Sequence, residues 1–125
     1  MKLAIAGSRS FNDFAFLEMK INELRTQYPI DGLISGGAKG ADVLAEQYAA
    51  KYHLAIERIL PDWKVHSRGA GHRRNEIIVQ KCDVLAAFWD GQSPGTRHIV
   101  AYAQKRDKQV FVFNDSHKQQ NKITT

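Results

Sequence analysis

The chain has 125 residues, the size of one domain, and can bury a hydrophobic core without help from disulfides or a metal. Hydrophobic residues make up 43% of it and charged residues 25%, which excludes an intrinsically disordered chain. Lys and Arg number 18 against 13 Asp and Glu, and the net charge of +5 favours anionic partners such as nucleic acids, nucleotides and sugar phosphates.

Short apolar runs alternate with segments of helical periodicity along the chain. Residues 2–6 form an apolar run that stops at Gly7, and residues 13–28 then carry apolar side chains at helical spacing. The same unit recurs, and the pattern predicts further strands at 33–35, 54–60, 83–89 and 110–113, and further helices at 40–52, 71–81 and 96–106.

This order of elements determines the fold class. Five strands that alternate with four helices imply right-handed crossovers and a parallel sheet covered by helices on both faces. We therefore predict a Rossmann-like α/β/α fold with a five-stranded parallel sheet in the order 3-2-1-4-5. Residues 1–113 form its single domain, and residues 114–125 are expected to be a polar, disordered tail.

Three loops of this fold are expected to meet at one edge of the sheet. In such sheets, ligands bind beyond the carboxyl ends of the strands where the strand order reverses, here between the first and fourth strands. Each of the three loops precedes a helix N-terminus, where free N–H groups attract anions. The candidate ligand-binding residues in these loops are Gly7, Ser8, Arg9, Gly36, Gly37, Ala38, Lys39, Gly40, Asp90, Gly91, Ser93, Gly95 and Thr96.

None of the three loops is a strong signal alone. The segment 36–40 is neither a P-loop nor a GxGxxG fingerprint, and any one of the loops could be only a tight turn between a strand and a helix. The prediction of a phosphate site depends on their convergence.

A basic stretch at residues 63–75 completes the predicted site. It contains no acidic residue, and Arg73 or Arg74 could bind a phosphate bidentately next to Asn75. Trp63 could stack on a base. The alternatives are that Trp63 covers the edge of the core and that the arginines form a solvated helix face.

Other kinds of site find little support. The five histidines and Cys82 lack zinc-ligand spacing, so we expect no metal site and no required cofactor beyond a nucleotide-derived ligand. Cys82 cannot form an internal disulfide, no apolar run is long enough for a membrane span, and the N-terminus is unlike a signal peptide. We therefore expect a cytoplasmic protein with no membrane partner.

Several of these motifs resemble the SLOG superfamily of Rossmann-like domains, which groups DprA (Smf) with the LOG proteins. The resemblance is closest to its small YspA-type members of unknown function and runs from Lys2 to about Phe113. It is carried by the segments Gly7-Ser8-Arg9, Ser35-Gly36-Gly37-Ala38-Lys39-Gly40-Ala41-Asp42, Arg74-Asn75 and Ser93-Pro94-Gly95-Thr96.

The branches of the superfamily imply different functions. LOG enzymes are phosphoribohydrolases with the signature PGGxGTxxE, but the catalytic glutamate falls at Ile99, which cannot transfer a proton. An N-glycosidase would have to use Glu76 or Asp90 instead. DprA binds single-stranded DNA, a partner that the positive charge leaves open. Relatives often dimerise, which makes a homo-oligomer a further expectation.

The first hypothesis is therefore a sensor or binding module for a nucleotide or nucleotide-derived phosphate ligand. In this hypothesis the loops hold the phosphate, Arg9, Lys39 and Arg73 neutralise it, and Asp90 accepts from ribose hydroxyls. The alternatives are a LOG-like nucleotide hydrolase and a DprA-like protein that binds single-stranded DNA.

Overall fold

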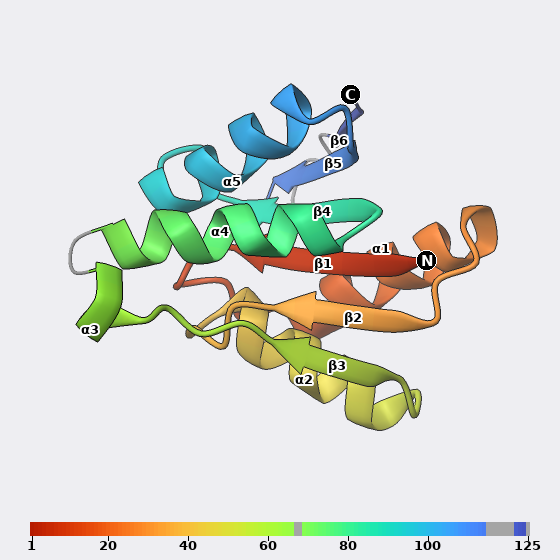
Figure 1. Ribbon diagram of the computed structural model, residues 1–125. Coiled ribbons are helices and arrows are strands. Elements are labelled where there is room, and N and C mark those ends of the chain that lie inside the picture. Colours follow the sequence, from red (N-terminus) through yellow and green to blue (C-terminus); the bar gives the residue numbers. More distant parts are fainter. Residues whose placement is uncertain (67–68, 115–121, 125) are drawn as a thin grey trace.

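The computed structural model describes residues 1–66, 69–114 and 122–124. Helices cover both faces of a central sheet (Figure 1). The strands are β1 (Lys2–Gly7), β2 (Gly32–Ser35), β3 (Ala55–Arg58), β4 (Val84–Trp89), β5 (Gln109–Asn114) and β6 (Lys122–Thr124). The helices are α1 (Phe14–Gln27), α2 (Ala41–Lys51), α3 (Trp63–His66), α4 (Ala70–Lys81) and α5 (Pro94–Lys105).

The sheet has the strand order β3-β2-β1-β4-β5-β6. Strands β1 to β5 are all parallel, which confirms the predicted Rossmann-like fold and its order 3-2-1-4-5. The end of the chain differs from the expected tail, because Asn114 still belongs to β5 and β6 pairs antiparallel with it. The outer edge of β5 carries N–H and C=O groups that need partners, and β6 supplies these partners.

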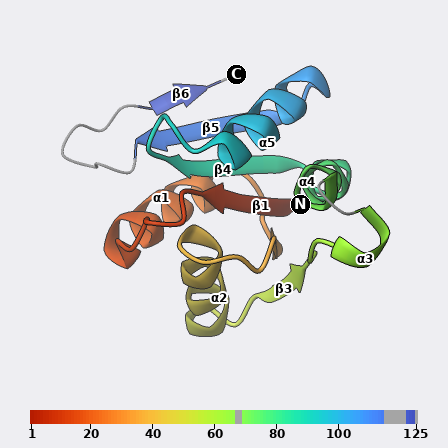
Figure 2. The same ribbon diagram turned by 90° about the vertical axis from the view of Figure 1, so that its left-hand side faces the viewer.

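Alternate side chains of the strands supply two separate cores. On one face, Leu3 and Phe88 pack with the apolar sides of α1 and α2. On the other face, Ala4 and Leu85 pack with α4 and α5. Figure 2 shows these two pairs of helices on opposite sides of the sheet. Because successive residues of a strand point to opposite faces, strands that are apolar throughout require this double cover.

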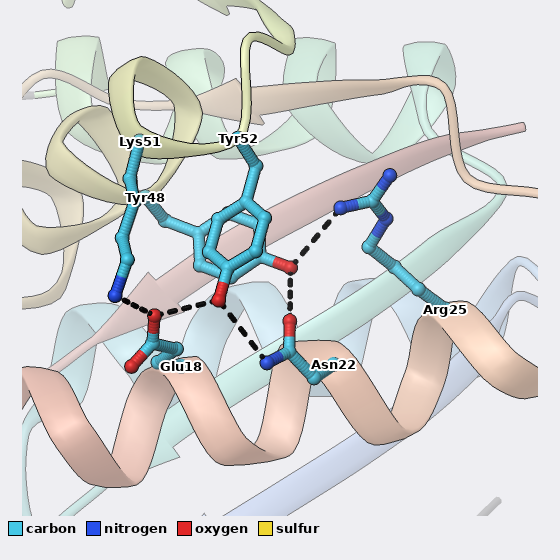
Figure 3. A network of polar contacts seen from close by, with 6 residues as sticks. All are labelled: Glu18, Asn22, Arg25, Tyr48, Lys51 and Tyr52. Atoms are coloured by element: carbon cyan, nitrogen blue, oxygen red, sulfur yellow. Dashed lines mark hydrogen bonds and ion pairs between the residues drawn. The ribbon is translucent and has the colours of Figure 1, made fainter.

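A polar network joins α1 to α2 on the first face (Figure 3). The fully buried Tyr48 donates its hydroxyl proton to Asn22 Oδ1 at 2.6 Å and accepts from Arg25 at 3.3 Å. Tyr52 stacks on Tyr48 with ring centroids 4.3 Å apart and donates to Glu18 at 2.7 Å. Each tyrosine thus buries an apolar ring and keeps a partner for its hydroxyl group.

Short helix α3 interrupts the connection between β3 and α4 and was not predicted. In the described ranges no helix combines the length and the apolar character needed to cross a bilayer.

Candidate functional site

A cavity of about 520 Å³ opens at the carboxyl ends of β1, β2 and β4. The strand order reverses between β1 and β4, so the cavity lies at the switch point where this fold class binds ligands. Its lining residues are Ile5, Ala6, Gly7, Arg9, Ser10, Gly36, Ala38, Asp42, Arg74, Asn75, Ile78, Ser93, Pro94, Gly95, Thr96 and Ile99.

Arg74 is the principal cationic group of the cavity wall. Its Nη1 donates to the carbonyl oxygen of Gly36 at 2.8 Å, and its Nε donates to Asn75 Oδ1 at 3.1 Å. These two bonds hold the guanidinium between the β2–α2 loop and α4. Burial, and secondarily the nearby charge of Arg9, lower the pKa of Arg74, while Asp42 opposes them. Arginine stays charged despite such a shift, so two arginines from distant parts of the chain, Arg9 and Arg74, line the cavity.

Asp42 brings a carboxyl group into the same wall. It lies in the first turn of α2 and is only 8% exposed. Its Oδ2 accepts from the backbone N–H of Ala38 at 3.0 Å, and the Gly36 amide also bonds to it. A Cβ at Gly36 would collide with Arg74 Nη1 and lie 3.2 Å from Asp42 Oδ2, so a side chain at this position would displace the Arg74 guanidinium from the loop. Burial raises the pKa of Asp42 to about 6, against the lowering influence of its amide partners and Arg74.

Asn75 connects the opposite wall to α5. Its Nδ2 donates to the Gly95 carbonyl at 3.2 Å and lies 3.2 Å from His98 Nδ1. The His98 ring stacks on His72 with centroids 3.9 Å apart, and burial lowers the pKa of His98, with His72 adding to the effect. Asn75 therefore fixes the N-terminus of α5 relative to α4.

The loop after β4 satisfies its own donors. Asp90 Oδ1 accepts from the backbone N–H groups of Gln92 and Ser93, both at 2.8 Å, and these bonds lower the pKa of Asp90. Ser8 Oγ accepts from the Asp90 N–H at 2.9 Å and from Ser93 Oγ at 3.2 Å. Ser8 and Asp90 thus join the β1 and β4 loops to each other and do not line the cavity.

The structure brings about half of the predicted ligand-binding residues together. Those that line the cavity are Gly7, Arg9, Gly36, Ala38, Arg74, Asn75, Ser93, Gly95 and Thr96. Those that do not are Ser8, Gly37, Lys39, Gly40, Trp63, Arg73, Asp90 and Gly91, and the candidate catalytic residue Glu76 is also outside.

Two of the predicted residues, Trp63 and Arg73, lie outside the cavity for simple geometric reasons. Trp63 lies on α3 beyond the carboxyl end of β3 and is 61% exposed. Arg73 lies one position before Arg74, so it points about 100° away around α4 and pairs with Glu76 at 3.2 Å. The neighbouring basic residue at position 68 lies outside the described residues.

Sequence reasoning did not place Asp42 or the apolar wall in the site. Asp42 follows the Gly-rich loop at a helix start, where a carboxylate also serves as an ordinary partner for free amides. The apolar wall consists of Ile5, Ile78 and Ile99, whose spacing is that of any core residue. The described residues contain no group of three or more His, Cys, Asp or Glu suited to a metal ion.

The comparison with known proteins identifies the family. Residues 1–66 match the model described as "YspA, cpYpsA-related SLOG family". The chain belongs to this SLOG family. It is also 34% identical over 122 residues to the Gene 61 protein of Mycobacterium phage D29, with 91% of this chain and 97% of the phage protein covered.

Solved structures share the fold of this SLOG protein at low sequence identity. DNA processing protein A from Helicobacter pylori, described for its single-stranded DNA binding mode, has a TM-score of 0.72 at 20% identity and covers 97% of this chain. DprA from Streptococcus pneumoniae has a TM-score of 0.73 at 19% sequence identity and covers 90% of this chain. The protein TM1055 has a TM-score of 0.62 at 20% identity and covers 87% of this chain. The matches span 68%, 50% and 71% of those three chains, so this protein corresponds to about half of the pneumococcal DprA.

Proposed function

We propose that this SLOG protein binds a nucleotide or nucleotide-derived phosphate ligand in the cavity and acts as a sensor or binding module. The observation that carries the proposal is the guanidinium of Arg74. Among the described residues, two of its five N–H groups bond to Asn75 and Gly36, and the other three remain for a ligand in the cavity that Arg74 lines. A guanidinium held in this way suits bidentate recognition of phosphate.

The start of α5 supplies further donors. Hydrogen bonds among the described residues use neither the Gly95 nor the Thr96 amide, as expected in the first turn of a helix. Both residues line the same cavity as Arg74. A phosphate between them would receive charge-assisted bonds from one side and amide bonds at a helix N-terminus from the other.

The rest of the cavity suits the nucleoside part of such a ligand. Its volume of about 520 Å³ lies within the range of small-molecule sites. Ile5, Ile78 and Ile99 line part of it as nearly buried aliphatic side chains, whereas Trp63 is not in the wall. We therefore expect aliphatic packing on the base rather than the aromatic stacking that Trp63 suggested.

Isothermal titration calorimetry with a panel of ligands tests the proposal. The panel contains AMP, ADP, a cyclic nucleotide, ADP-ribose and NAD, with adenosine as the control that lacks phosphate. We expect at least one phosphate-bearing member to bind with micromolar affinity and adenosine to bind far more weakly. If no member binds below millimolar concentration, the proposal is wrong.

Single-stranded DNA binding is the second candidate, because the fold similarity to a DprA described for that activity covers nearly the whole chain. The net charge of +5 is consistent with it. It predicts that fluorescence anisotropy detects binding to an oligonucleotide at low salt. The log–log salt dependence should then have a slope of roughly −0.7 per phosphate contacted. An absence of binding at low salt excludes it.

A LOG-like hydrolase is less well supported by the cavity. The position of the LOG glutamate is Ile99, which is buried in the wall, and Glu76 and Asp90 are engaged elsewhere. We therefore favour binding over catalysis.

A further inference from the structure

An acidic side chain lies in the wall of a cavity that is otherwise suited to anions. Asp42 lines the cavity together with Arg9 and Arg74, and it contacts the same residue of the β2–α2 loop as the Arg74 guanidinium, since the Gly36 amide bonds to Asp42 and the Gly36 carbonyl accepts from Arg74. An ionised carboxylate in this position would repel a phosphate that the two arginines attract. An ionised Asp42 and a bound phosphate would repel each other strongly in a partly desolvated cavity, so one of the two negative charges has to be reduced.

The groups around Asp42 have opposing effects. Its own loop provides the Ala38 and Gly36 amides, and α4 provides Arg74; all three favour the carboxylate. Glu46, one turn further along α2, favours the neutral acid, although Arg58 of β3 pairs with Glu46 at 3.8 Å. Burial outweighs the amides and Arg74 and raises the pKa to about 6.

The neutral acid is therefore accessible near pH 7. With a pKa of about 6, roughly one molecule in ten carries the proton at pH 7, whereas an ordinary aspartic acid would carry it in roughly one molecule in a thousand. A phosphate placed in the cavity adds a negative charge that raises the pKa further. Protonation of Asp42 on binding thus lowers the affinity only about tenfold at pH 7, and a hydrogen bond from Asp42 to the ligand can offset this loss.

We propose that Asp42 is protonated when a phosphate occupies the cavity and that its O–H donates a hydrogen bond to a phosphate oxygen. This inference rests on the proposed function and assigns Asp42 as the residue that couples ligand binding to proton uptake. The proton comes from the solvent and adds to the carboxylate, one Asp42 oxygen still accepts from the Ala38 N–H, and no other bond forms or breaks.

The coupling has a definite pH dependence. Above pH 6 the free protein holds Asp42 mainly as the carboxylate, so binding takes up one proton and the Kd rises about tenfold for each pH unit. Below pH 6, Asp42 is already protonated in the free protein, so the titration of Asp42 no longer makes the Kd depend on pH. Asp42→Asn provides a permanent amide donor and keeps an acceptor for Ala38, so its affinity should not share this dependence.

Titration calorimetry with AMP at pH 7.5 measures the proton directly. The same titration in HEPES and in Tris, buffers with different enthalpies of ionisation, gives the number of protons taken up. Comparison of wild type with Asp42→Asn cancels the contribution of the AMP phosphate group itself. Glu46→Gln is the matched control, because it removes a neighbouring carboxylate of α2 that lies outside the cavity wall.

We expect wild type and Glu46→Gln to take up about one proton more than Asp42→Asn. AMP binding by wild type without proton uptake would overturn the inference and leave the proposed function intact, even if Asp42→Asn does not fold. Equal uptake by wild type and Asp42→Asn would also overturn it, because the proton would then belong to another group such as His98. If AMP does not bind at all, the inference fails together with AMP as a ligand, and the other members of the panel still test the proposed function.

Discussion

Arg73 and Arg74 are neighbours in the chain, yet their guanidinium groups lie on different sides of α4. Arg74 bonds to the Gly36 carbonyl at 2.8 Å inside the cavity, whereas Arg73 pairs with Glu76 at 3.2 Å on the surface. The two positions make a matched pair for mutation, because both substitutions remove one positive charge from the same helix turn.

We predict that Arg74→Ala weakens nucleotide binding about 10- to 150-fold, which corresponds to the loss of about 1.5–3 kcal/mol of charged hydrogen bonding. Arg73→Ala should change the affinity less than about twofold, because an exposed ion pair contributes little. Titration calorimetry on both variants measures the difference. Equal losses would mean that only the overall charge of α4 matters.

Asp42 should make stability depend on pH. Its pKa is about 6 in the folded protein and 3.8 as the ordinary value, so between these pH values the folded state binds more protons than the unfolded state. The contribution of Asp42 to the free energy of unfolding is therefore fully present below about pH 4. It is lost as the pH rises through 6, and the total loss is up to about 3 kcal/mol.

Urea unfolding of wild type and Asp42→Asn between pH 4 and pH 8 measures this pH dependence of stability. We expect wild type to lose stability relative to the variant as pH rises from 4 to 6, with a constant difference above pH 7. A difference that does not vary with pH would contradict the raised pKa.

Gly40 and Gly95 should tolerate alanine very differently. Gly40 has a φ of 76°, and a Cβ there would collide with the backbone oxygens of Ser8 and Arg9. We expect Gly40→Ala to destabilise the protein by about 2 kcal/mol or more. A Cβ at Gly95 meets no atom within 4 Å, so Gly95→Ala should change stability by less than about 1 kcal/mol. Thermal unfolding ranks the two, and similar melting temperatures would contradict the geometry.

The network between α1 and α2 should contribute through Tyr48 more than through Lys51. Tyr48→Phe removes a buried hydroxyl that bonds to Asn22 and Arg25, at a cost of about 1 kcal/mol (Figure 3). Lys51→Ala removes an ion pair to Glu18 whose lysine is 56% exposed, so it should cost less stability than the loss of the Tyr48 hydroxyl. Chemical denaturation of both variants decides the order, and a larger loss from Lys51→Ala would be the contrary result.

The sequence by itself determined the layers and the strand order of this protein. Apolar runs such as 84–88, alternating with amphipathic helices, are typical of a parallel sheet covered by helices on each side, and crossover handedness limits the remaining arrangements. It also located the edge of the sheet where Gly7, Gly36 and Gly95 meet, because the carboxyl ends of parallel strands share one edge.

Only the tertiary structure decided which side chains at that edge reach the cavity. Whether Arg73 or Arg74 enters depends on the rotation of α4 about its axis, which is set by the packing of Ile78 and Val79 on the sheet. The raised pKa of Asp42 likewise depends on burial by parts of the chain that are far away in sequence. Periodicity identifies the elements and their apolar faces, but the direction of a single polar side chain at a helix start is fixed by contacts between elements.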